Sequence, residues 1–165
     1  MTALTNPFPP GDADRHAIWT MLVERDIDAF IAGDWSMVDG DFDHAGFFGL
    51  HAHRSELPDS WRMDFPDVAT YRDVWLSQSR ATAGTAYAEP LREALFRATN
   101  LRDIDVNGTV AVAHKKFDGT VRRADGGTDT LNWQTLYFCG IRDGRWKITG
   151  FVGYMPYPMG RFGGR

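Results

Sequence analysis

Cysteine is almost absent from this sequence. Cys139 is the only cysteine among 165 residues, which excludes an intramolecular disulfide and a zinc site built from several cysteines. No feature next to Cys139 in the sequence indicates an activated thiol. We therefore expect Cys139 to be a core residue.

An excess of positive charge is also missing. Lys and Arg number 18 against 22 Asp and Glu, so the net charge is −4, which argues against nucleic acid and anionic membranes as partners. The sequence has no apolar run long enough to span a bilayer. Residues 1–14 are polar and proline-rich, unlike a secretory signal. These features lead us to expect a cytoplasmic protein.

Cofactor signatures are absent as well. The sequence contains no glycine-rich phosphate-binding loop, flavin fingerprint or Ser-His-Asp arrangement, so we expect no cofactor. Aromatic residues, in contrast, are plentiful, with 6 Trp, 5 Tyr and 11 Phe. Rings at this density are typical of a thick core or an apolar pocket.

Periodicity divides the chain into a helical first half and an extended second half. Apolar spacing predicts one helix that starts between residues 12 and 15 and runs to 31 or 32, where Gly33 ends it, and a second over 67–83. The predicted strands and loops are a short strand over 47–53, a loop over 56–64, and strands over 93–106, 109–117, 130–141 and 145–154.

This order predicts an α+β fold with a curved antiparallel sheet wrapped around N-terminal helices. We expect a flexible N-terminal arm over 1–14, a single domain over 15–156 and a Gly/Arg tail over 157–165.

Two motifs at the ends of this element order carry a resemblance to a known family. Gly33-Asp34-Trp35 closes the first helix, and Asp143-Gly144-Arg145-Trp146-Lys147-Ile148 forms the last hairpin. Together they resemble the nuclear transport factor 2-like superfamily, in its SnoaL-like and scytalone dehydratase-like branch, from about Ala17 to Pro156. The resemblance implies a cystatin-like roll with a cone-shaped pocket, and often a homodimer or higher homo-oligomer. It does not imply one function.

Asp26 is the most informative candidate for chemistry. It lies in the middle of the apolar stripe of the first helix, so it should point inward. A buried carboxylate needs a partner or a shifted pKa, and both a structural and a catalytic role are open. In the resemblance, the oxyanion-binding tyrosine of ketosteroid isomerase falls on Asp26, which would have to be protonated to replace it.

His114 is the second candidate because histidine suits acid–base catalysis near neutral pH. It shares a strand face with Val110 and Val112. In the resemblance, the catalytic histidine strand of scytalone dehydratase matches 112–117. The other catalytic residues of that enzyme are not reproduced, since its Tyr-Asp pair falls on Phe30 and Ile31 and its second histidine near Asn100. A structural histidine is the alternative.

His51 and His53 share a face if 47–53 is extended, and one of them could be a general base. A metal site with Asp41, Asp43 and His44 is a less favoured alternative, and two histidines at an exposed rim are another. We predict no metal.

The pocket wall is expected to be aromatic. Alternation places Trp133, Thr135 and Tyr137 on one face of their strand, and ordinary core packing is the alternative for each ring. The expected substrate-binding residues are Phe30, Trp61, Tyr71, Trp75, Asn100, Trp133, Thr135 and Tyr137. The basic pairs Lys115-Lys116 and Arg122-Arg123 are interpreted as a solvated rim.

The sequence therefore predicts a cofactor-free acid–base enzyme, a dehydratase, isomerase or related lyase. Its substrate would be a small apolar molecule, aromatic or polycyclic. Asp26, His114, His51 and His53 are the expected catalytic residues. A non-catalytic ligand-binding or assembly module of the same fold is the alternative.

Overall fold

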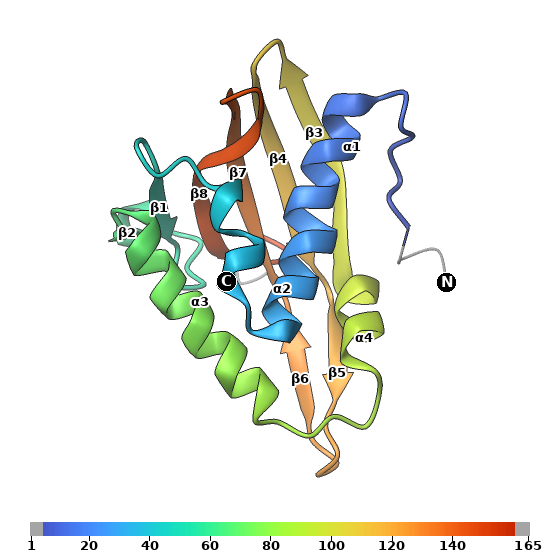
Figure 1. The fold of residues 1–165 in the computed structure, drawn as a ribbon. Coiled ribbons are helices and arrows are strands. Elements are labelled where there is room, and N and C mark those ends of the chain that lie inside the picture. Colours follow the sequence, from blue (N-terminus) through green and yellow to red (C-terminus); the bar gives the residue numbers. More distant parts are fainter. Residues whose placement is uncertain (1–4, 161–165) are drawn as a thin grey trace.

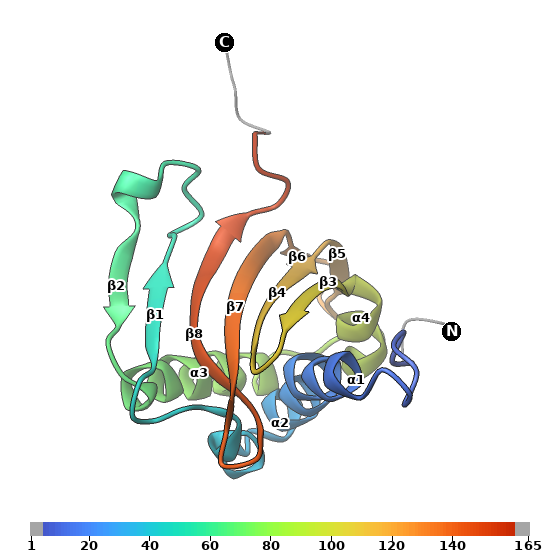
Figure 2. The same cartoon turned by 90° about the horizontal axis from the view of Figure 1, so that it is seen from above.

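The structure, a computed structural model, describes residues 5–160. Its helices form a layer on one side of a curved sheet (Figures 1 and 2). The helical segments are α1 (Ala13–Trp19), η2 (Thr20–Arg25), α2 (Asp26–Ala32), η3 (Trp35–Met37), η4 (Asp39–Asp41), η5 (Pro58–Ser60), α3 (Val68–Ala83) and α4 (Leu91–Ala98). The strands are β1 (Phe48–His51), β2 (Arg62–Phe65), β3 (Thr99–Asn107), β4 (Val110–Phe117), β5 (Gly119–Arg122), β6 (Thr128–Leu131), β7 (Trp133–Arg142) and β8 (Arg145–Pro156).

The main sheet has the strand order β2-β1-β8-β7-β4-β3. All neighbours run antiparallel except β1 and β8, which are parallel. A separate hairpin pairs β5 with β6. This arrangement confirms the predicted α+β class.

The first helical segment is continuous over residues 13–32, as predicted, but its middle turns form a π-helix. Gly33 ends it with a left-handed backbone at φ 67°, which glycine adopts without steric cost. The buried face of this segment includes Ile18, Leu22 and Ile27, and it packs with the inner face of the sheet.

Three parts of the chain differ from the prediction. Residues 93–98 belong to helix α4 rather than to a strand, because Leu91 to Ala98 contain strong helix formers after Pro90. Part of the expected loop over 56–64 is strand β2, which pairs with β1. The turns around 118–127 build the β5–β6 hairpin, which was not predicted.

The segment before α1 packs against the helix where it is described. Asn6 Nδ2 donates to the carbonyl oxygen of His16 at 3.0 Å, and Phe8 packs against the core. Of the expected C-terminal tail over 157–165, residues 161–165 lie outside the described residues, as do residues 1–4 of the expected arm. Within residues 5–160, no helix has the length and apolar character needed to cross a membrane.

Candidate active site

A cavity of about 310 Å³ lies between the helices and the inner face of the sheet. Helices α2, α3 and α4 line one side, and strands β4, β7 and β8 line the other. The β5–β6 hairpin and the loop after β1 contribute the remaining wall. Its volume is at the lower end of the range for small-molecule sites.

An ion pair lies in the cavity wall. Lys115 Nζ is 3.0 Å from Asp26 Oδ2 and also donates to the carbonyl oxygen of Leu22. Trp75 Nε1 donates to the other carboxylate oxygen, Oδ1, at 3.3 Å. The Lys115 side chain is 1% exposed, whereas that of Asp26 is 32% exposed. The carboxylate therefore accepts hydrogen bonds on both oxygens and still reaches the cavity.

Strand alternation explains why Lys115 points inward. Ala111, Ala113 and Lys115 are the buried positions of β4, and Val110 and Val112 are exposed. Small alanine side chains leave room for the helical segment to lie close to the strand. The lysine then extends past them to the π-helical turn.

Two tyrosines, Tyr71 and Tyr137, line the same cavity. Burial raises the pKa of Tyr71 and that of Tyr137 well above 10, and the negative charge of Asp26 raises both further. Both phenols therefore stay protonated at neutral pH. Neither hydroxyl has a hydrogen-bond partner within residues 5–160, so each can donate to an oxygen atom of a bound molecule.

Burial raises the pKa of Tyr154 as well, and this residue also lines the cavity. Its hydroxyl contacts Gln78 of α3, at 3.3 Å from the amide nitrogen. This contact connects β8 to α3 across the cavity wall.

A second polar group lies on the hairpin side of the cavity. The hydroxyl of Tyr87 donates to Asp129 Oδ2 at 2.9 Å, and Arg123 Nη1 lies 2.6 Å from Asp129 Oδ1. Tyr87 and Asp129 both line the cavity. The carboxylate of Asp129 is thus satisfied by protein donors on both oxygens.

The expected wall residues divide into two groups. Those that line the cavity are Phe30, Tyr71, Trp75, Trp133, Thr135 and Tyr137, and Asp26 joins them. Trp61 and Asn100 do not line it. Trp61 Nε1 donates to the carbonyl oxygen of Ser55 and the ring packs in a separate small cluster, while Asn100 is exposed on β3 opposite Lys116.

The expected inward direction of His114 is wrong. His114 lies on the face of β4 opposite to Lys115 and does not line the cavity. Its Nε2 lies 2.6 Å from Gln134 Oε1. The close approach of the helical segment selects the alanine face of β4, which carries Lys115 and not His114.

His51 and His53 do not share an extended strand, because β1 ends at His51 and His53 has a left-handed backbone at φ 52°. Their rings nevertheless stack at 4.0 Å, and His51 also stacks on Tyr154. His53 Nε2 lies 2.7 Å from Asp64 Oδ2. Loss of solvent lowers the pKa of His51, and His53 lowers it further. Neither histidine lines the cavity.

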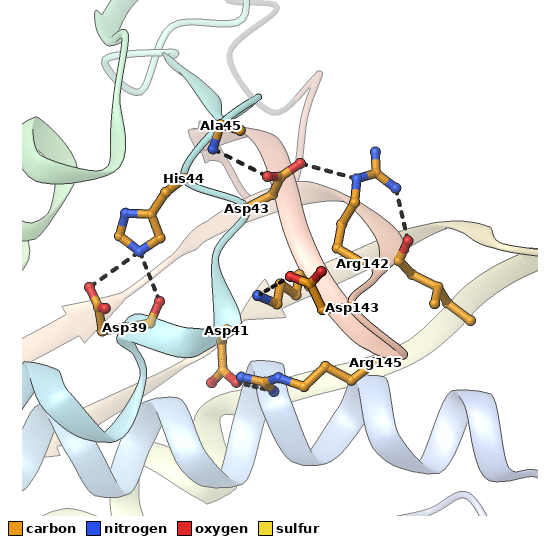
Figure 3. Close-up of polar contacts among 10 residues, drawn as sticks. Asp39, Asp41, Asp43, His44, Ala45, Arg142, Asp143 and Arg145 are labelled. Carbon is orange, nitrogen blue, oxygen red and sulfur yellow. Dashed lines mark hydrogen bonds and ion pairs between the residues drawn. The ribbon is translucent and has the colours of Figure 1, made fainter.

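The acidic loop considered for a metal site is occupied by arginines (Figure 3). Asp41 is 2% exposed and pairs with Arg25 and Arg145 at 2.8 and 2.9 Å. Asp43 pairs with Arg142 at 3.2 Å. The arrangement ties the loop after α2 to the last hairpin. Asp64, rather than Asp41 or Asp43, is the carboxylate next to His51 and His53.

Sequence reasoning missed Lys115 and Arg54 as cavity residues. Lys115 was interpreted as rim because it adjoins Lys116. A signal was present, since a carboxylate at an apolar helix position needs a cation, and Lys115 shares a face with two alanines. For Arg54, the sequence carries no comparable signal.

Comparison with known proteins shows the fold. No family model and no curated protein matches the chain. Among solved structures, it is similar to an NTF2-like protein of unknown function from Pseudomonas putida, with 14% identity, a TM-score of 0.56 and 91% of each chain covered.

Two further structures agree. An NTF2-like superfamily protein from Salmonella enterica has 16% identity and a TM-score of 0.52, with 87% of this chain and 92% of that one covered. A domain of unknown function with a cystatin-like fold from Nostoc punctiforme has 16% identity and a TM-score of 0.54, with 87% and 77% covered. The chain therefore has the fold of the nuclear transport factor 2-like superfamily.

Proposed function

We propose that this protein is a cofactor-free acid–base enzyme acting on a small, largely apolar carbonyl compound that contains a ring. The observation that carries the proposal is the Asp26 carboxylate, which reaches an aromatic cavity while Lys115 and Trp75 hold it in place. The cavity offers apolar surface for a ring and a few polar groups to orient it.

Asp26 is the proposed general base. Both of its oxygens accept hydrogen bonds from protein donors, so the group is held as an acceptor rather than placed as the hydrogen-bond donor that an oxyanion site needs. Asp26 would remove a proton from the carbon next to the carbonyl group, leaving an enolate. Lys115 is a positioning residue in this scheme, because its ammonium group fixes the carboxylate.

Tyr71 and Tyr137 are the proposed donors to the enolate oxygen. Their raised pKa values keep the phenolic protons in place, and donors that are already oriented stabilise charge as it develops. Return of the proton from Asp26 to another carbon completes an isomerisation. In a dehydration, a hydroxyl group leaves from the carbon next to the deprotonated one. It takes the proton that Asp26 holds and departs as water.

Proton abstraction can be tested before the natural substrate is known. We expect the protein in D₂O to exchange the α-protons of cyclic ketones such as tetralone and indanone, followed as loss of their NMR signals. Asp26→Asn removes the base and should lower the exchange rate at least ~100-fold. Asp28→Asn is the matched control, because Asp28 lies on the same helix, pairs with Arg92 and does not line the cavity.

The two variants separate catalysis from folding and binding. Thermal unfolding and ketone affinity are measured for both proteins alongside exchange. If the ketones bind but exchange equally fast with wild type and Asp26→Asn, the acid–base proposal is wrong. The non-catalytic ligand-binding module then becomes the better description.

A further inference from the structure

Arg54 is an exposed cation at the edge of the cavity wall, with no acidic partner among residues 5–160. It lies in the loop after β1 and lines the cavity. The acidic residues that line the cavity are already used, since Asp26 pairs with Lys115, and Asp129 pairs with Arg123 and Tyr87. Within residues 5–160, no carboxylate lies within ion-pair distance of Arg54. Its positive charge is therefore not neutralised by the described part of the wall.

The guanidinium group is held in a defined place. Its carbon lies 5.2 Å from the centre of the Trp133 ring, a distance suited to cation–π attraction. Arg54 Nη1 donates to Asn132 Oδ1 at 2.7 Å. The contacts on both sides of the group are thus neutral, and they leave its charge available.

The backbone of Arg54 is also fixed, at a conformational cost. Its N–H donates to the carbonyl oxygen of Tyr154 at 2.8 Å. Both residues have left-handed backbones, with φ 58° for Arg54 and 60° for Tyr154. Such conformations cost free energy for residues other than glycine and cluster at functional sites.

We propose that the cavity takes a carboxylic acid whose carboxylate binds Arg54. With Nη1 directed at Asn132, the Nε–H and Nη2–H groups remain for two parallel hydrogen bonds to a planar carboxylate. One positive charge without a partner complements a single negative charge better than a phosphate, which carries nearly two. The apolar wall takes the remainder of the molecule.

The register of the sheet relates this end of the ligand to the ion pair. Trp133, under the guanidinium, and Thr135, opposite Lys115 in the β4–β7 register, are two residues apart on β7. Two residues of a strand span about 7 Å, so Arg54 and the ion pair border neighbouring parts of the same wall. The proposed ligand is a ring compound whose carboxylate lies at Arg54 and whose reactive carbon faces Asp26, because both residues line the one cavity. This substrate class rests on the function proposed above.

A charge series on one apolar body tests the proposal. Affinities of naphthoate and naphthamide are measured by calorimetry, because the two differ mainly in charge. We expect wild type to bind naphthoate at least about 10-fold more tightly, the size of a charge-assisted hydrogen bond. Arg54→Gln should remove this preference by lowering the affinity for naphthoate alone. Arg54→Lys should restore part of it, since lysine keeps the charge but lacks the two parallel donors of the guanidinium group.

Arg102→Gln is the matched control. Arg102 is exposed on β3, lies outside the cavity wall, and has no ion pair within the described residues. This variant removes the same charge from the molecule and should leave both affinities unchanged. Equal binding of acid and amide by wild type, or a preference that survives Arg54→Gln, would overturn the carboxylate assignment.

Ketone exchange separates this inference from the proposed function. Exchange of neutral tetralone without any preference for naphthoate would overturn the Arg54 assignment and leave the acid–base function standing. An Arg54-dependent preference for naphthoate with no exchange of any ketone would overturn the acid–base function and leave the Arg54 assignment standing. Binding of neither naphthyl compound at millimolar concentration would overturn the carboxylate assignment, and ketone exchange alone would then decide the proposed function.

Discussion

At the scale of single residues, the ion pair between Asp26 and Lys115 is the most consequential feature. A lysine with a 1% exposed side chain is costly unless a carboxylate and other acceptors compensate it. Asp26 and the Leu22 carbonyl oxygen provide this compensation. The pair therefore has a structural role whether or not the protein is an enzyme, and catalysis must be tested separately from stability.

The structural role predicts strong coupling between the two residues. Asp26→Asn leaves the ammonium group of Lys115 buried without a counter-charge. The free energy of unfolding should fall by about 2 kcal/mol, less than for a fully buried pair because the Asp26 side chain is 32% exposed. In the Asp26→Asn/Lys115→Met protein, the second change should restore part of this loss, with a coupling energy of at least about 1 kcal/mol. Urea unfolding of wild type, Asp26→Asn, Lys115→Met and the double variant measures this coupling energy. Strict additivity would show that the pair contributes no net interaction.

His51 predicts a dependence of stability on pH. Burial, His53 and Arg54 lower its pKa from 6.5 in the folded protein, while Asp64 opposes them. The unfolded chain therefore binds the proton first as the pH falls. The stability contributed by neutral His51 is complete above pH 6.5 and is lost as the pH falls through the lower, folded-state pKa.

His51→Phe checks this sign. Phenylalanine keeps an aromatic ring beside Tyr154, which stacks on His51 at 4.2 Å, but it cannot titrate. Urea unfolding on either side of pH 6.5 should show a smaller acid-side loss of stability for the variant than for wild type. An equal loss in both proteins would mean that other groups cause it.

At the scale of elements, the long helices can be predicted from the sequence, whereas several short helices and strands cannot. The long helix over 13–32 and helix α3 follow from apolar periodicity and from clear ends at Gly33 and Gly84. Helix α4 was read as strand because it has only eight residues and continues directly into β3, and strands β5 and β6 have four residues each. These three short elements form one wall of the cavity, so the wall could not be predicted.

The face of a strand is a further limit of sequence reasoning. Alternation correctly groups Ala111, Ala113 and Lys115 against Val110, Val112 and His114. It does not say which group faces the helices, because that depends on how closely α1, η2 and α2 approach. Hydrophobicity alone favours the valines, whereas close packing favours the alanines and thus brings Lys115 rather than His114 to Asp26.

The contact of the β5–β6 hairpin with α4 gives a prediction at this scale. A Cβ at Gly119 would lie 2.7 Å from the Cβ of Ala98 and 3.1 Å from its Cα, so hairpin and helix would have to separate. Gly119→Ala should therefore lower the free energy of unfolding by about 2 kcal/mol. Gly84→Ala is the control, since its nearest atom would be at an ordinary 3.5 Å. Equal stability of the two variants in urea unfolding would contradict this packing account.

At the scale of the whole molecule, the curved sheet lies over the helix layer (Figure 2). A cavity lies between these two layers. Gly33-Asp34-Trp35 and the hairpin over 143–148 predict this fold from the sequence alone, and the solved NTF2-like structures confirm it. The fold determines where the cavity lies. The chemistry of the cavity depends on individual lining residues such as Lys115 and Arg54. The homodimer that the resemblance implies stays a prediction.

The central claim is that a ligand in this cavity presents a carbon atom to Asp26. The most direct test is a crystal structure of the protein with the ketone or keto acid that binds most tightly. Our account predicts the ring among the aromatic residues of the cavity and the carbon next to the carbonyl about 3–3.5 Å from an Asp26 oxygen. A ligand bound outside the cavity, or a cavity filled by side chains with Asp26 out of reach, would contradict it.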